Sequence, residues 1–301
     1  MFNRKDRLQI NKKLKKRRNG PQGNVNWRFS LPGSILNNVQ TKELRAYITG
    51  ELARSFAIFC VDEIIIFDET AKIKQEKINE YKEGNWSGQD PINSNNCECL
   101  LNPLDSMHHL RATDIDLPFR EGIVLEKSSK KGQKCFVGLE RVNERDVTLI
   151  NSELITPNKR VTLKLEEPKG SKKLKGYLTN SKQIREEAGI YWGYSVRIAK
   201  CLSEVINNSS YDFIIGTSER GTPIEEINIP KKEGCKILIV FGGLNGLEFA
   251  IESDPNINLK NPTDYFKNYI NCLPDQGSRI IRTEEAIPIC LTSLKYKLNS
   301  F

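Results

Sequence analysis

Residues 237–248, ILIVFGGLNGLE, join a run of apolar side chains to a loop that contains three glycines. A short apolar run that ends at glycine is typical of a buried strand in a parallel sheet. The residues after Gly246 predict a helix. A strand that passes through a glycine loop into a helix is a building unit of an α/β sheet.

Two further glycine-bearing loops follow predicted strands in the same half of the chain. Strand 213–215 leads into GTSERG (216–221), and strand 269–272 leads into LPDQGSR (273–279). Ligands of open α/β sheets collect at the carboxyl ends of strands, so three successive loops predict one pocket. Each loop alone is also explained by an ordinary turn. The loops lack both G-x-G-x-x-G and a Walker lysine, which argues against a dinucleotide site and a P-loop.

The N-terminal half begins another part of the same kind of sheet. Residues 25–31 alternate like a strand, Thr41 can cap a following helix, and residues 63–67 form a second apolar strand. Residues 69–99 are polar and predict a frayed helix to about Tyr81, followed by an exposed loop.

A β-rich segment interrupts the α/β pattern. Short strands at this spacing predict a small β-barrel. They are expected at residues 121–125, 134–137, 146–150, 160–165 and 175–179. The α/β pattern then returns, with a helix expected through Val196, Ala199, Leu202 and Ile206 and a last helix from about Thr283.

The positive charge of the chain is concentrated at its start. Residues 1–20 hold nine Lys or Arg and one acid, which accounts for the whole net charge of +8. Such a tail binds phosphates nonspecifically or serves as a nuclear import signal, and an idle solvated tail is the alternative. We find neither an apolar run of bilayer length nor a secretory signal, so we expect no membrane partner.

Cysteine and histidine give no metal signature. Most of the eight cysteines stand singly in apolar segments, as buried reduced thiols do. Cys97 and Cys99 have no second pair at ligand spacing, so we expect no metal site. His108 and His109 could supply a base, but a packing role is the simpler interpretation.

Several motifs resemble the SPOUT superfamily of methyltransferases, in the branch with the eukaryotic SPOUT-domain methyltransferase and its archaeal relatives. They lie at residues 31–69, 100–111 (LLNPLDSMHHLR), 119–125 (FREGIVL), 188–203 (AGIYWGYSVRIAKCLS), 211–221 (YDFIIGTSERG), 241–248 (FGGLNGLE) and 277–287 (GSRIIRTEEAI). The resemblance implies an α/β SPOUT fold with a parallel sheet, a C-terminal trefoil knot and an inserted OB-like barrel. It also implies S-adenosylmethionine as cofactor, RNA as substrate and a homodimer.

The resemblance divides the chain into a basic disordered tail and three domain segments. These are residues 1–24 (tail), 25–118 (N-terminal part of the SPOUT domain), 119–187 (OB-like insertion) and 188–301 (knotted, cofactor-binding part). Residues 69–99 are shorter and more polar than the corresponding family segment. We therefore expect one element of the first half-sheet to be missing, so that Ile64, Ile65 and Ile66 lose neighbours.

The family pattern also implies a set of cofactor-binding residues. They are Gly216, Thr217, Gly242, Gly243, Leu244, Gly246, Leu273, Gly277, Ser278, Ile280 and Thr283. Arg220, Arg282 and Glu284 are the polar candidates for catalysis, Arg282 also for a substrate phosphate. A local ion pair between Glu219 and Arg220 is the alternative for that loop, and acids favoured at a helix N-terminus are the alternative for Glu284.

The expected function is methyl transfer from S-adenosylmethionine to RNA, with N3 of a ribosomal uridine as the acceptor that the family suggests. The reaction needs alignment of the acceptor and removal of one proton, and it needs no protein nucleophile or metal. The alternatives are a non-catalytic assembly protein of the mitotic spindle or kinetochore and a plain RNA-binding factor. The expected location is the nucleus or nucleolus and the cytoplasm, with the spindle added under the first alternative.

Overall fold

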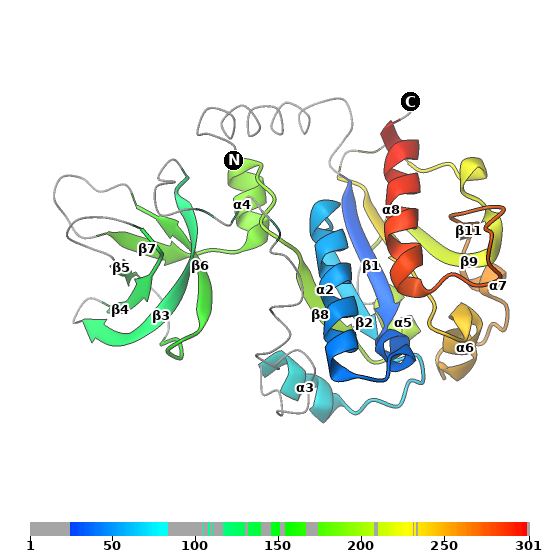
Figure 1. Cartoon of the computed structure of the whole chain (residues 1–301), viewed down its shortest axis with the longest axis horizontal. Coiled ribbons are helices and arrows are strands. Elements are labelled where there is room, and N and C mark those ends of the chain that lie inside the picture. The colour runs from blue at the N-terminus through cyan, green and yellow to red at the C-terminus, as the bar shows by residue number, and fades with distance from the viewer. Residues whose placement is uncertain are drawn as a thin grey trace. The chain divides into compact units, whose positions relative to one another are not determined.

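The computed structural model describes residues 25–83, 104, 108, 110, 117–129, 132–139, 146–150, 154–166, 174–207, 210–230, 232 and 234–299. The chain divides into two compact units, one of Met1–Pro103 with Gly193–Phe301 and the other of Leu104–Trp192 (Figure 1). The basic tail, the loop expected after Tyr81 and the Cys97–Cys99 pair lie outside the described residues, except for the end of helix α3.

The first unit is built on a parallel sheet. Its strand order is β11-β9-β10-β1-β2-β8, and every pairing is parallel. The strands are β1 (Asn26–Pro32), β2 (Glu63–Phe67), β8 (Ser195–Ala199), β9 (Phe213–Pro223), β10 (Lys236–Val240) and β11 (Asn268–Asn271). The predicted parallel α/β sheet is thus confirmed.

Helices cover both faces of this sheet (Figure 1). One face carries α2 (Lys42–Ile58) and α8 (Thr283–Asn299), and the other carries α5 (Leu202–Asn207), α6 (Gly246–Ser253) and α7 (Pro262–Tyr265). The short helices η1 (Gly33–Asn38), α3 (Gln75–Glu83) and η3 (Ile224–Glu226) complete the unit. Thr41 caps α2 as predicted, because its hydroxyl accepts the Leu44 N–H at 3.2 Å.

Strand β10 lies between two hydrophobic cores. Ile237 and Ile239 face the core under α2 and α8, while Leu238 and Val240 face the core under α5 and α6. All four side chains are fully buried. A strand buried on both faces needs apolar side chains at every position, which explains the continuous apolar run at residues 237–241.

The predicted helix through Val196 and Ala199 is wrong at its start. Residues Ser195–Ala199 form strand β8, and the helix begins only at Leu202. Val196 and Ile198 are β-branched and favour a strand. The positions 196, 199, 202 and 206 match a helical period only because a strand and a short helix follow one another.

Strand β8 also overturns the expected gap beside β2. Glu63 pairs with Ser195 and Phe67 with Ala199, so β2 has a neighbour on each side. Ile64 is 5% exposed and Ile65 is fully buried. Burial of such a side chain stabilises the fold by roughly 1.5–3 kcal/mol. Ile64 and Ile65 keep this stabilisation although the following segment, residues 69–99, is short and polar. The helix expected before Tyr81 is present as α3.

The second unit contains the predicted barrel. It closes in the order β3-β4-β5-β7-β6, with β5 and β7 parallel and the other pairs antiparallel. The strands are β3 (Phe119–Ser129), β4 (Gly132–Phe136), β5 (Asp146–Leu149), β6 (Arg160–Leu165) and β7 (Lys175–Leu178). Helix α4 (Ser181–Ala188), which the sequence analysis missed, follows the barrel with Asn180 as its N-cap and Gly189 in the left-handed region at its end.

Glu121 holds the barrel to the segment after α4. Its Oε1 accepts hydrogen bonds from the Thr162 hydroxyl and the Trp192 indole N–H, each at 2.7 Å, and its Oε2 lies 3.0 Å from Arg160 Nε. Burial opposes ionisation, but these hydrogen bonds and the Arg160 charge outweigh it and lower the pKa of Glu121.

The lowered pKa of Glu121 predicts a loss of stability in acid. A carboxyl group whose pKa falls on folding stabilises the protein above its unfolded value of 4.5, and that contribution disappears as pH falls through the folded pKa. We expect Glu121→Gln to lower the melting temperature at pH 7 and the difference from wild type to shrink below pH 4.5. Calorimetric melts across this range measure it, with the exposed Glu166→Gln as control. A difference independent of pH would contradict the assignment.

Among the described residues, no helix combines the length and apolar character that crossing a bilayer requires.

Candidate active site

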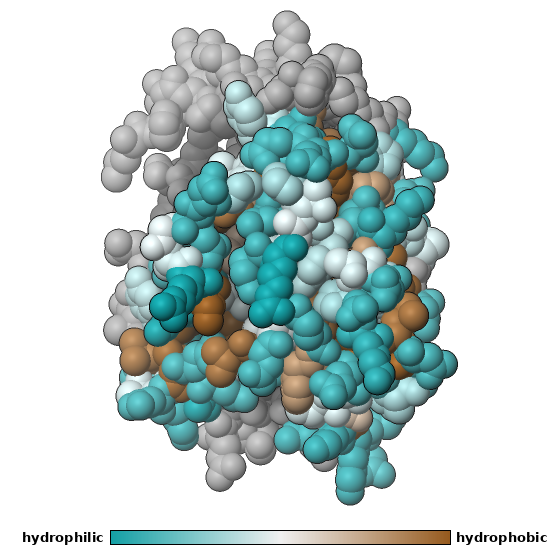
Figure 2. Space-filling view, turned by 90° about the vertical axis from the view of Figure 1, so that its right-hand side faces the viewer, coloured by the Kyte–Doolittle hydropathy of each residue, from teal (hydrophilic) through white to brown (hydrophobic). Residues whose placement is uncertain are grey.

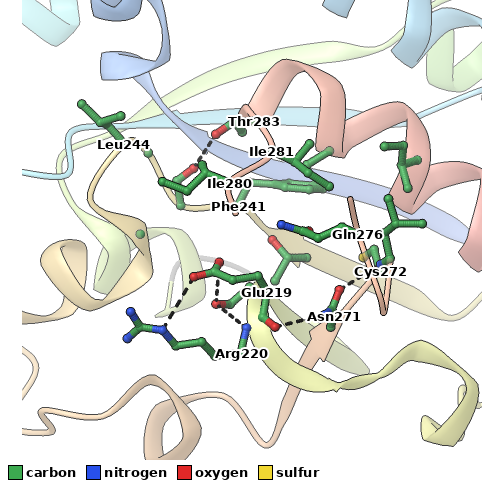
Figure 3. A pocket seen from close by; sticks show the side chains of 18 of the residues that line it. Glu219, Arg220, Phe241, Leu244, Asn271, Cys272, Gln276, Ile280, Ile281 and Thr283 are labelled. Atoms are coloured by element: carbon green, nitrogen blue, oxygen red, sulfur yellow. Dashed lines mark hydrogen bonds and ion pairs between the residues drawn. The ribbon is translucent and has the colours of Figure 1, made fainter. Parts of the chain in front are cut away.

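A pocket of about 370 Å³ lies at the carboxyl ends of β10 and β11, next to residues 217–220 within β9 and beside the start of α8 (Figure 3). This is the edge at which parallel sheets bind ligands. Its lining comes from the three predicted loops and from the first turns of α8. The lining residues are Thr217, Ser218, Glu219, Arg220, Phe241, Gly242, Gly243, Leu244, Asn245, Gly246, Glu248, Asn271, Cys272, Leu273, Gln276, Ile280, Ile281, Thr283, Ala286 and Ile289.

The first of these loops differs from its prediction. Strand β9 continues to Pro223 instead of ending at residue 215. Consecutive residues Tyr269 and Ile270 of β11 pair with Gly216 and Thr222 of β9, so residues 217–221 bulge out of the ladder. The bulge brings Thr217, Ser218, Glu219 and Arg220 to the pocket.

Most of the expected cofactor residues line this pocket. They are Thr217, Gly242, Gly243, Leu244, Gly246, Leu273, Ile280 and Thr283, together with Arg220. Gly216, Gly277, Ser278, Arg282 and Glu284 are not among the lining residues. Gly216 lies beneath the Phe266 ring, since a Cβ there would be 2.7 Å from it. Ser278 donates to the Ile280 carbonyl at 3.0 Å and so shapes the third loop.

Hydrogen bonds tie the walls of the pocket together. The Thr283 hydroxyl donates to the Gly242 carbonyl at 2.9 Å and joins α8 to the loop after β10. Thr217 donates to the Val240 carbonyl at 3.1 Å, and the Asn271 amide donates to the Glu219 carbonyl at 3.0 Å. The three loops are therefore fixed relative to one another.

Glycine is required where the β10 loop folds back on itself. A Cβ on Gly242 would lie 2.6 Å from the Gly246 carbonyl carbon and 2.7 Å from the Leu247 nitrogen. Gly246 has a φ of 72°, in the left-handed region that side chains rarely adopt. The loop thus exposes backbone to the pocket at these positions.

The charged residues around the pocket are paired. Arg220 Nε lies 3.6 Å from Glu219 Oε1 and Arg220 Nη1 lies 3.9 Å from Glu248 Oε1, so the local ion pair weighed for this loop is present. Arg282 Nη1 lies 3.9 Å from Glu284 Oε1, and the Arg282 N–H donates to Glu285 at 3.1 Å. These last contacts support the alternative interpretation of Glu284 and Glu285, in which acidic side chains are favoured at the N-terminus of a helix.

The two sides of the pocket differ in polarity. Phe241, Ile280 and Ile281 lie together in Figure 3, while Glu219, Arg220 and Asn271 lie opposite them. Asn271 and Phe241 were missed by the sequence analysis because they belong to strand ends, and only the register of β11 and β10 brings them to the pocket.

The face in Figure 2 is mainly hydrophilic, with apolar side chains in small separate groups.

Comparison with known proteins agrees with this site. Residues 27–100 and 91–294 match a family described as "putative RNA methyltransferase", so the chain belongs to this RNA methyltransferase family. The two matched segments overlap at residues 91–100, at the end of the polar stretch 69–99.

Relatives with curated names resemble the chain over most of its length. It is 39% identical to the human 28S rRNA (uridine-N(3))-methyltransferase over 88% of this chain and 77% of the human protein. The mouse protein of the same name is 38% identical, over 88% and 75%. The fruit-fly (Drosophila melanogaster) protein of that name is 37% identical, over 90% of this chain and 62% of its own.

The pocket suits S-adenosylmethionine, the methyl donor that the family implies. Its volume is that of a small-ligand site, about 300–1,000 Å³. The apolar side with Phe241 and Ile280 can hold an adenine ring, and the glycine backbone permits close approach. Glu219 and Glu248 supply negative charge near a cationic ligand.

Substitution of Gly242 tests the pocket directly. Gly242→Val places a branched side chain against the backbone of Gly246 and Leu247, so the loop must shift. We expect calorimetry to show at least a tenfold loss of affinity for S-adenosylmethionine, equivalent to about 1.4 kcal/mol. Gly277→Ala is the matched control, because its Cβ meets no atom within 4 Å. Equal affinity of a folded Gly242→Val would place the cofactor elsewhere.

Proposed function

We propose that this protein transfers a methyl group from S-adenosylmethionine to N3 of a uridine in large-subunit ribosomal RNA. The three-loop pocket at the carboxyl edge of the sheet carries the proposal. Membership of an RNA methyltransferase family supports the reaction class. The names of the human, mouse and fruit-fly relatives support the acceptor atom.

The protein's part in this reaction is to bind and align. The cofactor supplies a methyl group on a sulfonium, which is already an activated donor. Thr283 and Asn271 hold the loops around it through the hydrogen bonds described above. A fixed pocket with an apolar side lowers the entropic cost of alignment and keeps water from the reacting atoms.

The C-terminal knot belongs to the same proposal. Strand β11 lies at the sheet edge beside β9, yet α8 returns to the face covered by α2. The segment between them passes the β10 loop, to which Thr283 bonds. This path supports a threaded trefoil knot, in which the knotted loops and the pocket loops are the same residues.

The barrel is proposed to bind the RNA. Ile123 on β3 pairs with Phe136 on β4 and with Arg160 on β6, which places the three in one row across the strands. Ile123 is 46% and Phe136 is 42% exposed. Phe136 and Arg160 flank Ile123 in this row, and exposed aromatic and cationic side chains on one surface can stack on bases and contact phosphates.

A homodimer and the cellular location are further parts of the proposal. Leu244 and Ile280 at the pocket are 71% and 72% exposed, and a second copy of the chain would cover such apolar side chains. The basic residues 1–20 support entry into the nucleus or nucleolus, with a cytoplasmic pool. A role at the mitotic spindle or kinetochore remains the alternative, and the pocket favours the enzyme.

A methylation assay tests the function. The protein is incubated with labelled S-adenosylmethionine and transcripts of 28S rRNA fragments, and the nucleosides are separated by mass spectrometry. We expect 3-methyluridine as the labelled product, and its loss when the target uridine is replaced by cytidine. Label in another nucleoside, or none while the cofactor binds, would contradict the proposal.

A further inference from the structure

Among the described residues, several buried polar atoms have no hydrogen-bond partner, including Glu284 Oε2 beside Thr283, and two of them, on Glu69 and Ser34, lie on the same side of Gly243. Glu69 is only 8% exposed, and its Oε2 has no hydrogen-bond partner among the residues that the structure describes. The hydroxyl oxygen of Ser34 is also buried and without one. Such atoms are costly to bury, and each one calls for an explanation, such as a catalytic role or a bound water or ion.

Both atoms converge on the loop that lines the pocket. Ser34 follows β1, Glu69 follows β2 and Gly243 follows β10, and these three strands are neighbours in the sheet. A Cβ built on Gly243 would clash with the Glu69 carboxylate and lie 2.9 Å from Ser34 Oγ. Gly243 itself lines the pocket, so the pair of side chains adjoins the methyl-donor site.

The position of Glu69 is fixed by the residue before it. Asp68 accepts hydrogen bonds from the Thr70 N–H and hydroxyl through one oxygen, at 2.9 and 2.8 Å. Its other oxygen accepts the Lys72 and Ile73 N–H groups, at 2.9 and 2.8 Å. The hydrogen bonds of Asp68 therefore hold the turn after β2, and Glu69 Oε2 takes no part in them.

We propose that Glu69 and Ser34 form the subsite for the acceptor base, with Glu69 as the proton acceptor. This inference rests on the proposed function. Uracil presents a carbonyl, an N3–H and a second carbonyl in a row. The Ser34 hydroxyl donates to a carbonyl oxygen, and the Glu69 carboxylate accepts the N3–H.

The proton and electron balance of the step is simple. The N3 lone pair forms the bond to the methyl carbon as the carbon–sulfur bond breaks, and that bond's electron pair stays on sulfur. The N3 proton moves to Glu69, which then releases it to solvent. Cytosine has a lone pair at N3 in place of the proton, and this lone pair and the carboxylate repel each other. The pair therefore also selects uridine over cytidine.

The main test compares Glu69→Gln with wild type, because glutamine keeps the shape and removes the proton acceptor. We expect the single-turnover rate on uridine RNA to fall roughly 10²–10⁴-fold. Affinity for S-adenosylhomocysteine, measured by calorimetry, should stay within about threefold, a difference under 1 kcal/mol. The deficit should shrink with 5-fluorouridine as acceptor, because its N3–H is more acidic. Glu76→Gln, an exposed acid on α3, is the matched control.

A binding measurement keeps this test independent of turnover. In the presence of S-adenosylhomocysteine, wild type should prefer an RNA with one uridine among adenosines over the same RNA with cytidine. Glu69→Gln and Ser34→Ala should each lose that preference. If wild type is inactive but this pattern appears, the proposed function fails and the subsite stands.

Three results would overturn the subsite. The first is a wild-type rate in Glu69→Gln. The second is a parallel loss of S-adenosylhomocysteine affinity, which would show that Glu69 only supports the Gly243 loop. The third is a uridine preference that is absent from wild type or survives in both variants.

Discussion

The central constraint in this protein is the pairing of β10 with β1 on one side and β9 on the other. The register Phe29 to Ile239 and Ile239 to Ile215 places the first described strand of the chain in one sheet with two strands from its second half. Because every strand is parallel, their carboxyl ends meet at one edge, and the loops that follow them come together. The pocket, the Thr283–Gly242 hydrogen bond and the placement of Ser34 and Glu69 depend on this register.

The barrel is inserted without breaking that constraint. The chain leaves the sheet unit after β2 and α3 and returns at β8, which pairs directly with β2. Arg197 on β8 and Arg28 on β1 both lie 3.2 Å from the Glu63 carboxylate, so ion pairs span the three strands. Strands β2 and β8, which precede and follow the insertion in the chain, therefore pair with each other, and the barrel keeps its own hydrophobic core around Val124 and Leu163.

The periodicity of apolar residues predicted those elements for which it fits only one kind of secondary structure. Residues 64–67 and 237–241 are continuous apolar runs, and five short alternating segments predicted the barrel strands. Strand β8 was missed because Val196 and Ala199 fit a helical period as well as a strand, and only pairing with β2 decides between them. The resemblance to a known family, rather than spacing, predicted nine of the twenty residues that line the pocket. Glu69 and Ser34 could not be found from spacing, since their neighbourhood exists only through the order β10-β1-β2.

Hydrogen exchange with and without S-adenosylmethionine tests the central claim most directly, that the three loops at one sheet edge form a single cofactor site. We expect the cofactor to slow exchange together at residues 217–221, 241–246 and 271–283. We expect no change in barrel strands such as β5, whose amides serve as the internal control. Protection confined to one of the three loops, or appearing only in the barrel, would contradict it.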